Sequence, residues 1–152
     1  MKIHIVLDNI RSAFNVGSIF RTADGAGNVE KIYLCGITST IDNPKLEKTA
    51  LGALDFIDSE HYDTTMDAIE ELKEQNIPIY SIELDNDSIN FQDFKYPDEF
   101  AIVFGHEKKG VDPEILKVSD KILSIPMRGK KESLNVANTA GIILYEATRG
   151  NN

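Results

Sequence analysis

Short apolar runs rich in isoleucine and valine alternate with helical periods, and this alternation limits the fold more than any other feature of the chain. Most of six such runs are expected to be buried strands: residues 3–8, 30–37, 55–59, 77–84, 100–105 and 121–126. The clearest helical period places Met66, Ile69 and Leu72 on one face, and Thr64 or Thr65 can cap its start. This order predicts an α/β fold, with a mostly parallel sheet and helices on both faces.

Ligand-binding positions follow from such a fold, because ligands lie at the carboxyl ends of the strands, where loops lead into helices. The rule selects the loops after residues 8, 104 and 126. Two phosphate-binding motifs are missing: no G-x-G-x-x-G follows the first strand, and "GKKES" has no Walker glycine five residues before its own glycine. Residues 83–100 are expected to be an irregular connection, and they lack the glycine and terminal glutamate of a calcium loop. Dinucleotide-dependent enzymes, P-loop NTPases and calcium proteins are therefore disfavoured.

Length and composition favour a single domain over residues 1–152. The chain contains 41% hydrophobic and 27% charged residues, as is ordinary for a globular protein with one core. No apolar run approaches the roughly 20 residues of a membrane span, and the opening "MKIHIVLDN" lacks the apolar region of a signal peptide. A cytoplasmic protein is expected.

The charge balance and the cysteine count narrow the function further. A net charge of −9 argues against binding nucleic acid with the whole surface, so only a local basic patch could bind phosphates. The single cysteine, Cys35, lies in the apolar run "KIYLCGI" and is expected to be a buried, inert thiol. One cysteine can form neither an internal disulfide nor a zinc cluster.

The segment "NVGSIFRTADGAG", residues 15–27, combines an apolar helical stripe with an unusual polar one. The core-facing stripe should contain Val16, Ile19, Phe20 and Ala23. The opposite stripe should contain Ser18, Arg21, Thr22 and Gly25. Asn15 is a candidate N-cap, and Gly17 should leave a notch beside Arg21 that a substrate backbone could enter. An amphipathic helix with a solvated arginine and a tolerated glycine fits the pattern equally well, although that glycine costs about 1 kcal/mol relative to alanine.

The second loop, "FGHEKKGV" at residues 104–111, presents a carboxylate between two glycines. Gly105 and Gly110 allow close approach of the backbone to a ligand, and Glu107 lies on the expected ligand edge. His106 is more simply explained as part of an ordinary polar turn.

The third loop, at residues 125–135, contains the densest basic cluster of an acidic chain. Arg128, Lys130 and Lys131 are the natural place for phosphate contact, although such clusters are usually just solvated. The helix that should begin near Ser133 is apolar around almost its whole circumference. It therefore needs cover on two sides, either in a homodimer or in the interior of the fold.

Together these three loops resemble the SpoU/TrmH branch of the SPOUT RNA methyltransferases. The motif N-x-G-x-x-x-R matches Asn15, Gly17 and Arg21, and the motif G-x-E-x-x-G matches Gly105, Glu107 and Gly110. The third motif, I-P-M followed by S-L-N, matches residues 125–127 and 133–135. The resemblance covers residues 8 to about 147. It implies methyl transfer from S-adenosylmethionine to a ribose 2′-hydroxyl of RNA, a C-terminal trefoil knot, and a homodimer that completes the site.

The resemblance also implies roles for individual residues. Cofactor contacts should come from Gly105, Ile125, Ser133 and Leu134, with another wall near residues 82–84. The catalytic or substrate-positioning set should be Asn15, Arg21, Glu107, Ser133 and Asn135. This chain departs from the family at two positions: His106 stands where asparagine is common, and Ala137 where serine is frequent.

The implied reaction needs no metal, because a sulfonium methyl group is already activated. A guanidinium stays protonated below about pH 12, so Arg21 should clamp an RNA phosphate. An oxygen of that phosphate then accepts the proton of the ribose 2′-hydroxyl. The alternative is that Arg21 itself is the base, which requires a sharply lowered pKa. RNA contacts are expected from Arg11, Arg21, Arg128, Lys130 and Lys131. We expect tRNA rather than rRNA, since no additional RNA-binding domain precedes the fold. Two rivals are a catalytically silent RNA-binding or regulatory dimer and a flavodoxin-like nucleotide-binding domain.

Overall fold

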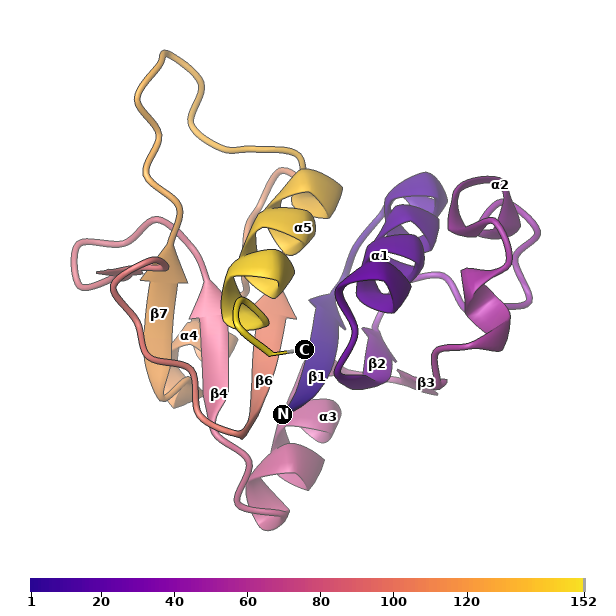
Figure 1. Ribbon diagram of the computed structural model, residues 1–152, viewed down its shortest axis with the longest axis horizontal. Coiled ribbons are helices and arrows are strands. Elements are labelled where there is room, and N and C mark those ends of the chain that lie inside the picture. The colour runs from indigo at the N-terminus through magenta and orange to yellow at the C-terminus, as the bar shows by residue number, and fades with distance from the viewer. Residues whose placement is uncertain (152) are drawn as a thin grey trace.

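A computed structural model describes residues 1–151 and contains a seven-stranded sheet in the order β3-β2-β1-β6-β4-β7-β5, with all strand pairs parallel (Figure 1). The strands are β1 (Lys2–Asp8), β2 (Val29–Cys35), β3 (Ser59–Tyr62), β4 (Ile79–Ile82), β5 (Ile89–Asn90), β6 (Glu99–Phe104) and β7 (Lys121–Ser124). The helices are α1 (Ala13–Ala26), α2 (Glu47–Ala50), the 3-10 turn η1 (Ala53–Asp55), α3 (Thr65–Glu74), α4 (Pro113–Val118) and α5 (Val136–Ala147). The expected α/β architecture is confirmed, and the trefoil knot stays a prediction.

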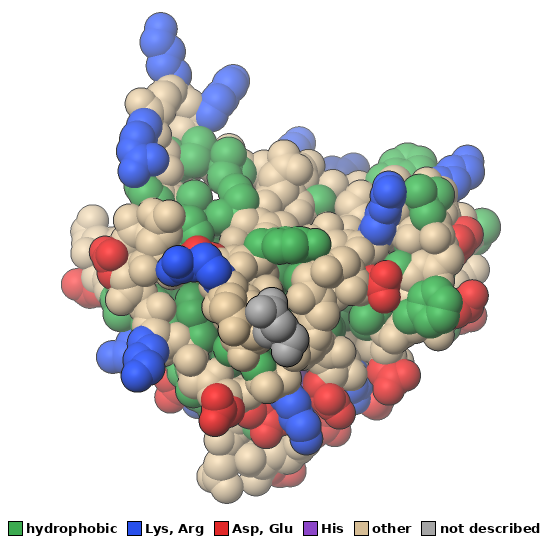
Figure 2. Space-filling view, in the orientation of Figure 1, with side chains coloured by type: hydrophobic (Ala, Val, Ile, Leu, Met, Phe, Trp, Pro, Cys, Tyr) green, Lys and Arg blue, Asp and Glu red, His purple; other side chains and the backbone are tan. Residues whose placement is uncertain are grey.

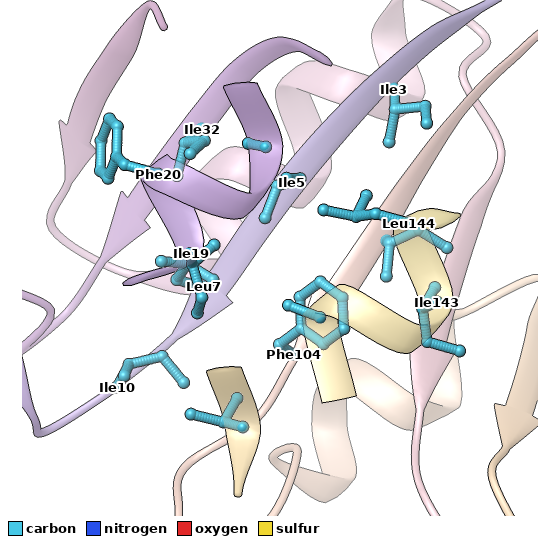
Figure 3. Packing of buried hydrophobic residues seen from close by; sticks show 14 of the residues in the cluster. Ile3, Ile5, Leu7, Ile10, Ile19, Phe20, Ile32, Phe104, Ile143 and Leu144 are labelled. Carbon is cyan, nitrogen blue, oxygen red and sulfur yellow. The ribbon is translucent and has the colours of Figure 1, made fainter. Parts of the chain in front are cut away.

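Alternating side chains of the strands form one core on each face of the sheet. Ile5 and Leu7 of β1 belong to the core under α1 and α5, where Figure 3 shows Leu7 beside Ile19, and the opposite face of the strand presents Val6 to α3 and α4. The expected core stripe of α1, from Val16 to Ala23, is fully buried. Each face of the sheet therefore has its own layer of helices.

Buried Asp8 holds the carboxyl end of β1 against the opposite layer. Its carboxylate accepts hydrogen bonds from the Thr65 hydroxyl at 2.6 Å and from the Asp112 backbone amide at 2.9 Å. Thr65 opens α3, and Asp112 is the N-cap of α4. One charged side chain thus fixes the starts of two helices at the edge where ligands are expected.

One strand expectation needs correction, and one irregular connection contains a short strand. Residues 55–59 are not a strand: the chain turns through η1, Phe56 is 75% exposed, and the strand begins only at Ser59. Leu51 and Gly52 have left-handed backbone conformations and start this turn, so the apolar residues within 55–59 do not form an extended strand. The connection at residues 83–100 contains the two-residue strand β5, which pairs with β7 and is too short to produce a periodic pattern.

The predicted helix starts were right for α3 and wrong for α1 and α5. Thr64 caps α3, as expected. Asn15 is not the N-cap of α1, because Ser12 takes that position and its hydroxyl oxygen accepts from the Asn15 amide at 3.2 Å. The last helix begins at Val136 rather than near Ser133, because Asn135 caps it.

The notch expected beside Arg21 is filled by the protein itself. Gly17 is buried against α2, and a Cβ atom there would lie 2.2 Å from both the Leu46 carbonyl oxygen and the Thr49 hydroxyl oxygen. The glycine therefore allows two helices to pack closely and admits no substrate backbone. With only four residues, α2 gives no periodic signal in the sequence.

Cys35 is buried, as expected, and burial followed by the charge of Asp8 raises the pKa of its thiol to about 12. Among residues 1–151, no helix is long and apolar enough to cross a membrane. Within the same range, no three His, Cys, Asp or Glu side chains gather in a way that could hold a metal ion.

Candidate active site

A pocket of about 440 Å³ opens at the carboxyl ends of β4, β6 and β7. Its wall includes all four residues for which the resemblance implies cofactor contact: Gly105, Ile125, Ser133 and Leu134. Residues 82–84 form another wall, in agreement with the looser expectation for that strand end. Three segments that are distant in the sequence therefore meet in one cavity of a size that suits a small ligand.

Gly105 allows the loop after β6 to fold tightly onto itself. A Cβ atom at this position would lie 2.2 Å from the Val111 amide nitrogen and 2.3 Å from the Gly110 carbonyl carbon. His106 and Gly110 exchange two backbone hydrogen bonds, at 2.8 and 3.0 Å. The backbone at Gly105 is therefore left bare on the pocket wall.

The His106 ring stabilises this loop. Its Nδ1 atom accepts from the backbone amides of Lys108 and Lys109, at 3.1 and 3.2 Å. An accepting Nδ1 has no proton of its own, which matches the ordinary polar turn expected for this residue.

Glu83 is a pocket residue that the sequence analysis did not single out. Its carboxylate accepts from the Val111 amide at 2.9 Å and lies so close to Gly110 that a Cβ atom there would be 2.2 Å from Glu83 Oε2. Gly110 also has a φ of +73°, so only glycine fits easily at this position. The signal available in the sequence was a carboxylate one residue before the end of the expected strand at residues 77–84, near the ligand edge.

Glu107 connects the loop after β6 to the start of α1. Its two carboxylate oxygens accept from the backbone amides of Arg11 and Ser12, each at 3.0 Å. Partial burial alone would raise the pKa of the Glu107 carboxyl, but hydrogen bonds from the Ser12 and Arg11 amides and from the Asn15 side chain lower it below its usual value. A carboxylate before the first turn of a helix also interacts favourably with the helix dipole.

Asn15 and Asn135 join the two helices that cover the same face of the sheet. The Asn135 side-chain amide donates to the Asn15 side-chain oxygen at 3.2 Å, while its own oxygen accepts from the Ala137 and Asn138 amides at the start of α5. Glu107, Asn15 and Asn135 thus lie next to one another as a polar chain, in which a hydrogen bond joins Asn15 and Asn135 and the Asn15 side chain helps to lower the pKa of Glu107. Ser133 is exposed and lines the pocket beside it.

Arg21 stands apart from this polar chain. It follows Asn15 by six residues, about 9 Å along a helix axis at the usual rise. Its exposed side chain lines a different groove, of about 510 Å³, together with Lys48, Leu51 and Tyr145. A single copy of the chain therefore does not bring Arg21 into the pocket that contains Gly105.

The five basic residues expected to contact RNA occupy three separate places. Arg128, Lys130 and Lys131 lie on the loop between β7 and α5, which projects from the molecule in Figure 1 and carries gathered Lys and Arg side chains in Figure 2. Arg21 lies in its own groove, and Arg11 lies in another groove of about 460 Å³ that borders the loop after β6.

The outer side of α5 is partly uncovered. Ala140, Ile143 and Leu144 are buried against the sheet, whereas Ile142 is 38% exposed and Tyr145 is 55% exposed. The alternative of a fully interior helix is therefore wrong for this chain. Tyr145 borders the same groove as Arg21, so the uncovered side of α5 is continuous with the exposed stripe of α1.

Comparison with known proteins gives consistent matches over almost the whole chain. The model of the SpoU rRNA Methylase family matches residues 2–145. A tRNA (guanosine(18)-2′-O)-methyltransferase from Aquifex aeolicus is 34% identical over 146 residues, which cover 95% of this chain and 68% of that protein. A 23S rRNA (guanosine(2553)-2′-O)-methyltransferase from Bacillus subtilis is 31% identical, over 93% of this chain and 56% of that protein.

Among solved structures, an AdoMet-bound rRNA methyltransferase from Sinorhizobium meliloti superposes with a TM-score of 0.91 at 26% identity. The superposition covers 99% of this chain and 57% of that one. The present chain thus spans between about half and two thirds of the length of these relatives.

Proposed function

The chain belongs to the SpoU rRNA methylase family, and we propose that it transfers the methyl group of S-adenosylmethionine to a ribose 2′-hydroxyl of RNA. One observation carries this proposal. The pocket collects Gly105, Ile125, Ser133 and Leu134 from two loops and lies directly beside the polar chain of Glu107, Asn15 and Asn135. A methyl donor and a positioned hydroxyl group therefore have adjacent places at the same edge of the sheet.

The residues of the pocket suit S-adenosylmethionine. Ile125 and Leu134 offer apolar surface, and Gly105, which packs tightly against the backbone of Gly110 and Val111, lines the wall with main-chain atoms only. The carboxylates of Glu83 and Glu107 place negative charge near a ligand that carries a sulfonium cation. Bound S-adenosylmethionine supplies a methyl group that its sulfonium already activates.

The protein then has to hold the ribose oxygen in line and help remove its proton. Glu107 fixes the start of α1, and Asn135 fixes the start of α5 and bonds to Asn15 of α1, so this edge is kept rigid. Arg21 acts as a clamp on an RNA phosphate. The phosphate oxygen accepts the proton of the 2′-hydroxyl, because a guanidinium keeps its own proton near neutral pH and cannot act as a base.

A homodimer is part of the proposal, because Arg21 is remote from the pocket within one chain. The uncovered side of α5, with Ile142 and Tyr145, offers an apolar surface next to Arg21. Pairing two copies over this surface would bury it and would bring the Arg21 of one copy toward the pocket of the other.

We propose tRNA as the substrate and rRNA as the alternative, because the relatives include methyltransferases named for each. The same proposal places the protein in the cytoplasm, where both RNA classes are found. RNA is bound by local basic sites, namely the projecting loop with Arg128, Lys130 and Lys131 and the grooves of Arg11 and Arg21, in keeping with the acidic chain.

The test is methyl transfer from labelled S-adenosylmethionine to RNA from cells that lack the protein. We expect label in the tRNA fraction, at a nucleotide that resists alkaline cleavage because its 2′-oxygen is methylated. Label in the rRNA fraction alone would support the alternative substrate. Cofactor binding without label in any RNA would overturn the proposal and identify a catalytically silent RNA-binding or regulatory dimer.

A further inference from the structure

A second groove borders the pocket on the far side of Glu107. Glu107 and Lys108 line both cavities, so the groove, of about 460 Å³, begins where the pocket ends. Its walls combine one large aromatic side chain, Phe14, with three cationic ones: Arg11, Lys45 and Lys108. It is also lined by Ser12, Ala13, Ser39, Asn43 and His106.

Phe14 does not belong to the core of the protein. The buried stripe of α1 runs from Val16 through Ile19 and Phe20 to Ala23, whereas Phe14 lies outside it and is 46% exposed. Its backbone is nevertheless fixed, because its carbonyl oxygen accepts from the Thr49 hydroxyl at 2.7 Å. An aromatic ring is thus held on a rigid helix with a large part of its surface open to solvent.

The charges around the ring favour an anionic partner. Arg11, Lys45 and Lys108 are all exposed, in a chain whose net charge is −9. The carboxylate in the groove, Glu107, already accepts from the amides of Arg11 and Ser12, so its oxygens are partly satisfied within the protein. Three exposed cations around one exposed ring form a phosphate-binding rim with an aromatic platform inside it.

We propose that Phe14 stacks on an unpaired base of the substrate RNA, next to the nucleotide that is methylated. Arg11, Lys45 and Lys108 bind the phosphates on either side of that base. Aromatic side chains bind single-stranded RNA in this way because every base has a stacking face, and bases in loops are free to leave their neighbours. The inference rests on the proposed function, since the stacked base must belong to the RNA that accepts the methyl group.

The site selects for RNA structure. A base can reach Phe14 only if it is unpaired, so the groove favours a loop or bulge beside the target ribose over a regular duplex. Stacking tolerates any base, whereas Ser39 and Asn43 can form hydrogen bonds to a base edge or to a 2′-hydroxyl.

The first experiment uses steady-state methyl transfer to tRNA transcripts, with Phe14→Leu compared with the wild-type protein. We expect KM for tRNA to rise about tenfold, within the range found for loss of one stacked base, while the cofactor Kd stays unchanged. Phe14→Tyr should retain the wild-type KM, because it keeps the ring. Phe56→Leu is the matched control, since Phe56 is 75% exposed and lines neither cavity.

The second experiment exploits the absence of tryptophan from the sequence. Phe14→Trp introduces a single indole, and stacking on a base should quench its fluorescence as tRNA transcript is added. Phe56→Trp should show little quenching, and a fully paired RNA duplex should quench Phe14→Trp less than the transcript does. Circular dichroism and light scattering confirm that all variants keep the fold and the assembly of the wild type.

The outcomes separate this inference from the proposed function. Wild-type methyl transfer with unchanged KM in Phe14→Leu and no quenching in Phe14→Trp would overturn the stacking and leave the function intact. Quenching of Phe14→Trp by RNA that the wild-type protein never methylates would support the stacking and overturn the function.

Discussion

The pocket at the ends of β4, β6 and β7 and the outer face of α1 and α5 differ in how complete they are within one chain. In the pocket, the loop backbone around Gly105 is braced by Glu83 and Glu107, both of which have hydrogen-bond partners. On the outer face, Arg21 and Tyr145 point into an open groove of about 510 Å³. Within one chain, the pocket is thus enclosed by three segments, whereas Arg21 borders a separate and open groove.

The two regions also differ in what holds them. The pocket depends on backbone atoms that approach within a van der Waals contact, so it cannot tolerate even one added methyl group at Gly105. The outer face depends on long or exposed side chains such as Arg21 and Ile142, which can change without disturbing the fold. Substitutions in one region should therefore leave the function of the other measurably intact.

The largest effect is expected for Arg21→Ala. Loss of the phosphate clamp should lower kcat for methyl transfer by about 10²-fold or more, because such groups stabilise charge that develops in the transition state. The cofactor Kd, measured by calorimetry, should not change. Arg149→Ala is the control, since Arg149 is exposed and pairs with Glu146 at the end of α5. A parallel loss of cofactor affinity in Arg21→Ala would show that the two regions are not separate.

The second-largest effect is expected for Gly105→Ala, which changes the pocket alone. The new methyl group would collide with the backbone at Gly110 and Val111, so the loop must move, and we expect the cofactor Kd to rise more than tenfold. Gly129→Ala is the matched control, because a Cβ atom at Gly129 meets nothing within 4 Å. Equal cofactor binding by both variants would mean that this loop does not form the cofactor site.

A smaller effect, which depends on protein concentration, is expected for Ile142→Glu. A charge on the uncovered side of α5 should convert a dimer into monomers in light scattering, and methyl transfer should fall with it. Cofactor binding should persist, since the pocket is complete in one chain. Ile41→Glu provides the control, because Ile41 is 49% exposed in the loop before α2. A wild-type protein that is monomeric at working concentrations would rule out the shared site.

The smallest effect concerns Glu107 and pH. Because the folded-state pKa of this carboxyl is lowered, its stabilising contribution is present above the unfolded value of about 4.3 and is lost as the pH falls. Glu107→Gln should therefore lower the urea midpoint at pH 7, and the difference from the wild type should shrink toward pH 4. A difference that grows on acidification would contradict the assigned direction of the pKa shift.

The sequence identified the pocket well because the signals there are local. Gly105, Glu107 and the third loop lie directly after apolar runs that form β6 and β7, and parallel strands bring their carboxyl ends to one edge. Arg21 was placed correctly on the exposed stripe of its helix by periodicity. Its distance from the pocket could not be predicted, since helical spacing says nothing about which cavity a side chain borders.

The errors have a common physical origin in short elements and distant contacts. Gly17 looked like a substrate notch because α2, which fills that space, has only four residues. Asn15 looked like a helix cap because its partner, Asn135, lies 120 positions away and becomes a neighbour only when α5 packs beside α1. The hydroxyl group of Ser12 is equally suited to cap a helix by residue type, and it is the cap of α1 in the structure.

The sequence by itself determined the α/β architecture, the two faces of α1 and the loops that meet at the ligand edge. These features follow from the periodic burial of apolar side chains, which depends on near neighbours in the chain. Only the tertiary structure decided that Gly17 serves helix packing, that Glu83 braces the pocket, and that Phe14 lies open among three cations. Those outcomes depend on which surfaces meet across the sheet, and close packing between distant segments leaves no periodic trace in the sequence.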